Sequence, residues 1–141
     1  GQHAGVYFNA FSEDLFVWDN DEDHNNESMR LSVLQSSLNR YHSYLLEDME
    51  KSEEGFNVYP KIQSKLDRYN PNYSFVINTY KVAGTDEDDI EKGIDSFSFY
   101  ALDDVEQVYP IKISRGEERI FIWCFFFINC YRIQIRSYCR H

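Results

Sequence analysis

The sequence predicts an α+β fold: an antiparallel sheet of four to six strands with two helices packed on one face. Three observations predict it. Segments 29–50 and 58–69 carry apolar residues at spacings of three and four, which indicates helices. Several later segments alternate apolar and polar residues, as strands do when one face is buried and the other is exposed to solvent. The run 120–128 is apolar throughout, and its β-branched and aromatic content favours a central strand covered on both faces.

Length and composition predict one domain spanning residues 1–141. A chain of 141 residues is long enough to bury a core, and it shows no repeat, low-complexity tract or obvious linker. Hydrophobic residues make up 43% and aromatic residues 17%, which excludes a disordered acidic protein. The core is therefore expected to be rich in aromatic side chains.

The first expected helix, 29–50, follows a possible cap at Ser28, and the second, 58–69, has Pro60 near its start. One apolar stripe is expected on each. The stripe of the first helix consists of Leu31, Leu34, Leu38, Tyr41, Leu45 and Met49, and that of the second of Ile62, Leu66 and Tyr69.

The remaining elements are expected to be extended. A hairpin is predicted within residues 5–18, and polar exposed loops at 19–26 and 84–89. Alternation or β-branched content predicts further strands at 73–82, 97–101, 109–113, 120–128 and 131–136.

The charge is unevenly distributed. Residues 1–110 carry 22 acidic and 8 basic side chains (−14), and residues 111–141 carry 2 acidic and 6 basic ones (+4), for a net charge of −10. An acidic surface repels phosphates, which argues against nucleic acid as a partner. The apolar run of nine residues is shorter than the roughly 20 that span a bilayer, which argues against a membrane anchor.

Three cysteines, Cys124, Cys130 and Cys139, are crowded into one segment, and an odd number does not suggest a disulfide framework. They predict reduced thiols and an intracellular location, in the cytoplasm or nucleus, with Cys124 as a small core residue.

No pattern predicts a metal, a cofactor or a catalytic centre. Asp19, Asp21 and Asp23 have the spacing of a calcium loop, but His24 stands where such a loop needs glycine and Arg30 where it needs glutamate. The four histidines lack ligand spacing, and no base is signalled beside a cysteine. We therefore expect no cofactor and no enzymatic activity.

The expected central strand is apolar on both faces, so it needs a covering layer on the side away from the helices: the N-terminal hairpin, a second copy of the protein or a partner chain. We predict a protein–protein interaction module, an adaptor or regulatory subunit, whose partner or second copy covers that face or pairs with the edge strand at 131–138. Charged side chains on that strand also fit simple protection of an exposed edge. The predicted partner-binding residues are Trp123, Phe125, Phe127, Arg132, Ile133 and Arg136.

Two alternatives remain open. Clustered carboxylates also suit an acidic inhibitor that imitates nucleic-acid charge, of viral or phage type, if they lie in rows at phosphate spacing. In addition, residues 80–86 and the motif of Trp123, Phe125, Phe127, Asn129, Arg132 and Cys139-Arg140 resemble blocks of the RNA polymerase III transcriptional repressors. That resemblance implies a divergent repressor. The order of two helices followed by four strands resembles the Tctex-type dynein light chains, which implies a dimeric adaptor.

Overall fold

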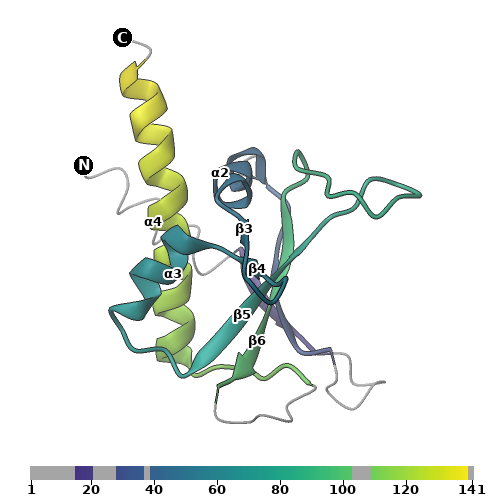
Figure 1. Cartoon of the computed structure of the whole chain (residues 1–141), viewed down its shortest axis with the longest axis vertical. Coiled ribbons are helices and arrows are strands. Elements are labelled where there is room, and N and C mark those ends of the chain that lie inside the picture. Colours follow the sequence, from purple (N-terminus) through teal and green to yellow (C-terminus); the bar gives the residue numbers. More distant parts are fainter. Residues whose placement is uncertain (1–14, 21–27, 37–38, 103–108, 140–141) are drawn as a thin grey trace.

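The computed structural model describes residues 15–20, 28–36, 39–102 and 109–139, with the backbone alone at 40, 41, 44 and 129–139. A twisted sheet forms one layer, and the helices α3 and α4 form a second layer on one of its faces (Figure 1). Along the chain the elements are β1 (Phe16–Asp19), β2 (Arg30–Val33), the 3-10 helix η2 (Asn39–His42), α2 (Ser43–Glu47), β3 (Glu50–Lys51), β4 (Asn57–Val58), α3 (Pro60–Asp67), β5 (Tyr73–Thr79), β6 (Ile94–Ala101) and α4 (Arg115–Cys139).

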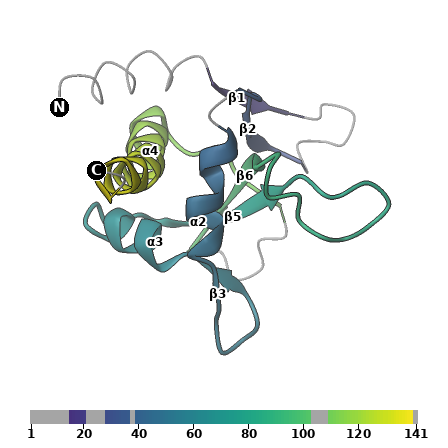
Figure 2. The same cartoon turned by 90° about the horizontal axis from the view of Figure 1, so that it is seen from above.

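The main sheet has the strand order β1-β2-β6-β5, and every neighbouring pair is antiparallel. Strands β3 and β4 form a separate two-stranded sheet. The view from above shows α3 and α4 together on one side of the main sheet (Figure 2). The predicted α+β class, with a four-stranded antiparallel sheet, is therefore confirmed.

An aromatic core joins α4 to the sheet. The Phe121 ring lies 4.8 Å from that of Phe97 and 4.9 Å from that of Phe99, both on β6. One turn later, the Phe125 ring lies 5.4 Å from Phe97 and 5.8 Å from Phe16 of β1. These contacts are edge-to-face, the geometry that aromatic quadrupoles favour. They fix α4 across β1 and β6.

The expectation of a strand at 120–128 is wrong, because these residues lie inside α4. The helix begins with a reciprocal cap: the Ser114 N–H donates to Glu117 Oε1 (3.1 Å), and the Glu117 N–H donates to Ser114 Oγ (3.2 Å). Ser-x-x-Glu ahead of an apolar run is the sequence pattern of a capping box. This local signal starts a helix, and the helix overrides the β-propensity of the run.

Helical geometry also changes which residues are buried. Phe121, Phe125 and Ile128 share the face toward the sheet, whereas Trp123 and Phe127 lie on the outer face. The helix continues through 131–136, so the expectation of a strand there is wrong as well. The C-terminal half of α4 projects beyond the sheet (Figure 1). Within the part of the chain that is described, no helix combines the length and apolarity needed to cross a bilayer.

The expected long helix at 29–50 is also wrong. It is replaced by β2, η2, α2 and the start of β3. Leu31 and Val33 are buried two residues apart, as in a strand, whereas Leu34 and Met49 of the expected stripe are exposed. The same leucines fit a period of two near the start and a helical period further on, and pairing with β1 and β6 decided between them.

The other expectations are closer. Helix α3 lies within 58–69, with Pro60 in its first turn and Ile62 and Leu66 buried. Strand β5 covers residues 73–79 of the expected strand at 73–82, and β6 includes the expected strand at 97–101. Segment 109–113 contributes an isolated bridge, Phe99 to Ile111, rather than a strand. Of the expected N-terminal hairpin and acidic loop, residues 5–14 and 21–27 lie outside the described part.

Candidate functional site

The face of the sheet opposite α3 and α4 is polar near its centre. Ser96, Ser98 and Tyr100 alternate on β6 with core residues, so their side chains lie on this face. Asn78 of β5 pairs with Ser96, and its Nδ2 donates to the Oγ atoms of Ser96 and Ser98, both at 3.0 Å. The hydrogen bonds hold these side chains in a fixed arrangement across two strands.

A pocket of about 330 Å³ opens over these residues. That volume is at the small end of the range for ligand sites. The lining comes from β5, β6, the start of β2 and the segment before α4. The lining side chains are Ser28, Arg30, Asn78, Asp95, Ser96, Ser98, Tyr100 and Pro110. Hydroxyl and amide groups dominate the wall, so the pocket suits a polar ligand.

One cation and one carboxylate stand at this pocket. Arg30 Nη2 donates to Asp19 Oδ2 at 2.9 Å, but the Arg30 Nε is buried without a partner among the described residues. Asp95 Oδ2 accepts a hydrogen bond from Ser96 Oγ at 3.0 Å. Burial, together with the Asp95 carboxylate, raises the pKa of Tyr80, which also hydrogen-bonds to Asp95. The guanidinium therefore keeps a donor for a ligand, while Asp95 is engaged by neighbours.

A guanidinium beside several hydroxyl groups is suited to phosphate and ribose, because it offers planar, charge-assisted donors and the hydroxyls donate or accept as needed. The Ser28 Oγ is likewise buried with no partner in the described part of the chain. Satisfying such buried groups favours binding of a polar ligand. The chemistry of the lining therefore suits a polar ligand that carries phosphate or hydroxyl groups.

Metal binding has no support in the described ranges, where no three His, Cys, Asp or Glu side chains cluster. Asp19 of the acidic loop is paired with Arg30 instead. Cys124 is fully buried, as predicted, and burial raises its pKa to about 11, so its thiol stays protonated at neutral pH and is a poor nucleophile.

His42 is a structural residue of the covered side of the sheet. It is buried against Phe125, with ring centroids 5.3 Å apart, and its Nδ1 accepts a hydrogen bond from the Ile94 N–H at 3.1 Å. Burial lowers its pKa to about 4. Gly93 has φ +81, and a Cβ there would lie 2.7 Å from His42 Nδ1, so the turn before β6 and this histidine are closely fitted.

The predicted partner-binding residues do not form a sheet face or an edge strand. Trp123 and Phe127 are 38% and 37% exposed on the outer face of α4, and their rings stack at 5.3 Å. Phe125 is in the core, so its expected role in binding is wrong. Arg132, Ile133 and Arg136 lie on the C-terminal half of α4, where the structure describes the backbone alone.

Sequence reasoning missed the polar pocket. The alternation of Ser96, Ser98 and Tyr100 did predict a wet face for this strand. Arg30 and Ser28, however, lie in or beside a segment that was read as a helix, so nothing placed them beside β6. Long-range strand pairing brings them together.

The comparisons with known proteins give one informative similarity. An anticodon nuclease from Escherichia coli is 31% identical to this chain over 124 residues, which cover 86% of this chain and 26% of the nuclease. The chain thus spans about a quarter of the length of this relative. No protein-family profile matches the chain, and no solved structure matches it.

This similarity contradicts the expectation of no enzymatic activity, because the relative is an enzyme. No catalytic motif was recognised in the sequence, because residues that meet from separate strands leave no local pattern. The adaptor, charge-mimic and repressor hypotheses, the homodimer and the absence of a cofactor stay predictions.

Proposed function

We propose that this chain is an RNA-contacting part of a protein of the anticodon-nuclease type, and that its polar pocket binds a ribose-phosphate group of a tRNA. The observation that carries the proposal is the 31% identity to the Escherichia coli anticodon nuclease along 86% of the chain. A similarity of that extent runs through most of the chain, rather than through one short motif.

The pocket supports the proposal chemically. Arg30 has a buried donor without a partner among the described residues, and Ser96 and Ser98 hold their hydroxyls beside it. A phosphate would accept from the guanidinium, while a ribose hydroxyl would bond to serine or Asn78. The acidic net charge, which argued against nucleic acid, averages over the whole chain and does not describe this site.

The test is binding and cleavage of tRNA by the 141-residue chain. Fluorescence anisotropy with a labelled anticodon stem-loop measures affinity, and a denaturing gel of a tRNA pool measures cleavage. Arg30→Gln removes the charge-assisted donor, and we expect it to weaken binding about tenfold or more. Folding should persist, because the Arg30–Asp19 pair is largely exposed and contributes at most about 1 kcal/mol.

Lys92→Gln is the matched control, because it removes the same charge from an exposed loop that does not line the pocket. It should leave affinity within about twofold. Equal affinities of the wild type and Arg30→Gln would refute the role of the pocket. Failure of the chain to bind or cleave any tRNA would refute the proposed function.

A further inference from the structure

A second surface, on the helices rather than the open sheet face, carries a concentration of basic side chains. On α3, Lys61, Lys65 and Arg68 follow one another at spacings of four and three, so they share one side of the helix. Residues 60–68 contain these three bases and one acid, Asp67, in a chain of net charge −10. Helix α3 packs against α4.

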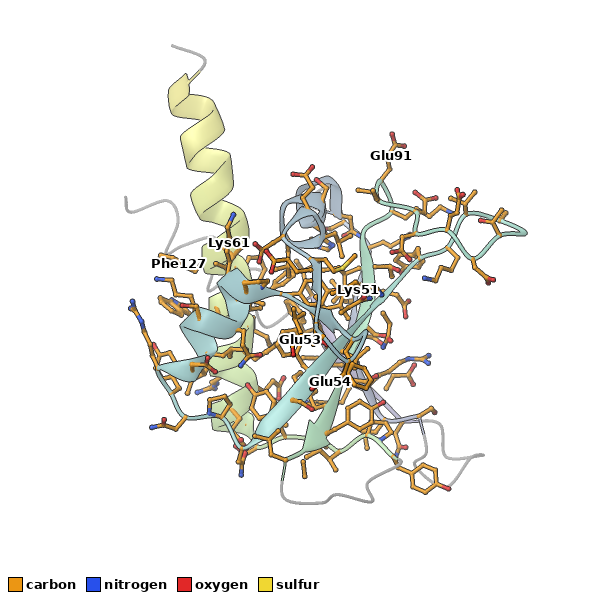
Figure 3. All side chains as sticks on the ribbon, in the orientation of Figure 1. Lys51, Glu53, Glu54, Lys61, Glu91 and Phe127 are labelled. Atoms are coloured by element: carbon orange, nitrogen blue, oxygen red, sulfur yellow. The ribbon has the colours of Figure 1, made fainter. Side chains whose placement is uncertain are left out.

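The facing helix adds further positive charge. Arg115, Arg119, Trp123 and Phe127 are exposed and recur every four residues along the outer face of α4. Neither Arg68 nor Arg119 forms an ion pair with a described residue, and the Lys61 pair with Asp48 is long, at 3.9 Å. Figure 3 labels Lys61 at the start of α3 and Phe127 on α4, with Glu91 on the loop that precedes β6. We call Lys61, Lys65, Arg68, Arg119, Trp123 and Phe127 the basic–aromatic surface.

The two aromatic rings of this surface form a platform. Trp123 and Phe127 are stacked with an interplanar angle of 29°, and Lys65 Nζ lies 4.4 Å from the Phe127 centroid. Phe127 thus contacts both an indole ring and a cation, the latter in a cation–π arrangement. The described ring contact of Trp123 is with Phe127, which leaves its outer face for another planar group.

The charges decide between possible occupants. In a two-fold dimer the same surface meets itself, which would place Lys65, Arg68 and Arg119 near their own copies and cause repulsion. Single-stranded nucleic acid supplies what this surface lacks: phosphates for the cations and flat bases for the indole. A duplex fits poorly, because its bases are already stacked and paired.

We propose that the basic–aromatic surface binds unpaired RNA nucleotides, with Trp123 stacking on a base and Lys65, Arg68 and Arg119 contacting the flanking phosphates. This inference rests on the proposed function and deepens it: the pocket and this surface would bind different parts of one RNA, and an unpaired loop would be the preferred substrate.

The experiment measures the affinity of the 141-residue chain for labelled oligouridylate and for an RNA duplex of equal length. We expect the single strand to bind more tightly. Trp123→Ala should weaken that binding about tenfold, because base–aromatic stacking is lost, and Trp123→Phe should retain most of it. Phe56→Ala, which removes an exposed aromatic ring from the β3–β4 hairpin, is the control and should have no effect.

Salt dependence tests the cations separately. In log–log form, the affinity for a single strand falls with salt at a slope of about −0.7 per phosphate contact, so Lys65→Gln and Arg68→Gln should each make the slope shallower by about that amount. Lys92→Gln should leave the slope unchanged. Circular dichroism of each variant checks that the fold persists.

The outcomes separate this inference from the proposed function. Loss of tRNA binding in Arg30→Gln with none in Trp123→Ala would overturn the inference and leave the proposed function standing. Oligouridylate binding that depends on Trp123, without any tRNA binding or cleavage, would support the surface and overturn the proposed function. A dimer in sedimentation that Trp123→Ala dissociates, with RNA affinity unchanged, would show that a second copy covers the surface instead.

Discussion

The two faces of the main sheet differ in what their side chains do. The face toward α4 consists of aromatic and aliphatic groups, among them Phe97 and Phe99, which are fully buried. The opposite face presents Ser96, Ser98 and Asn78 in a hydrogen-bonded array beside Arg30. One strand, β6, supplies both sets by alternation.

The contrast separates stability from binding. Apolar burial on the helix-covered face drives folding, whereas the polar face keeps donors that have no partner among the described residues and so has capacity for a ligand. Changes on the first face should alter stability strongly, and changes on the second should alter binding with little loss of stability.

The largest expected effect is that of Phe121→Ala. Phe121 contacts Phe75, Phe97 and Phe99 and is fully buried, so truncation leaves a cavity and should lower the free energy of unfolding by about 3–5 kcal/mol. Val76→Ala, on the polar face and 47% exposed, should cost less than about 1 kcal/mol. Urea denaturation of both variants measures the difference. Equal losses would remove the distinction between the faces.

A lower pH should reduce the free energy of unfolding by an intermediate amount. Burial lowers the pKa of His42 from its ordinary value of 6.5 to about 4 in the folded chain. In the unfolded chain the histidine keeps the ordinary value, so the unfolded chain binds the proton first as the pH falls. Stability should therefore be unaffected by His42 above pH 6.5 and should decline between pH 6.5 and 4, by roughly 3 kcal/mol at most. Denaturation midpoints across this range measure the decline.

The matched variant for this measurement is His42→Asn, whose side-chain oxygen can accept the Ile94 N–H but does not titrate near these pH values. Its stability should depend less on pH over the same interval, although carboxylates still titrate in both proteins below about pH 5. Parallel pH profiles of the two proteins would contradict the assignment.

The smallest expected effect is that of Ser114→Ala, which removes the hydroxyl that accepts the Glu117 N–H at the start of α4. Loss of such a cap should cost about 1 kcal/mol, because an N–H of the first turn loses its partner. Thermal unfolding checks the size. Ser74→Ala, an exposed serine on the polar face of β5, should have a much smaller effect. No difference between them would mean that packing alone specifies this helix.

The sequence predicted the fold class and several elements correctly. Pro60 with Ile62 and Leu66 identified α3, and the alternation of Phe97 and Phe99 with serines identified β6 and its two faces. The errors came where one apolar pattern fits two periods. A continuous apolar run fits a strand or a helix equally well, and the strand at 120–128 was predicted from β-branched and aromatic content alone, without the capping box that precedes it.

The candidate site could not be predicted from local sequence patterns, for a related reason. The pocket joins Arg30 to Ser96 and Ser98, more than sixty positions away in sequence, through the β2–β6 pairing. The basic–aromatic surface joins Lys65 to Phe127 only because α4 is a helix beside α3. Trp123 and Phe127 were predicted as binding residues, but Phe125, expected beside them, proved to be buried.

By itself the sequence determined the amount of apolar and aromatic material available for a core, the alternation that gives β6 one wet face, and the cap that starts α4. Only the tertiary structure decided which residues of the apolar run face inward and which polar groups meet. The physical reason is that the burial of a side chain depends on what its element packs against. Phe121 and Phe125 are in the core because they face Phe97 and Phe99 of the sheet, whereas Trp123 lies on the other side of the helix.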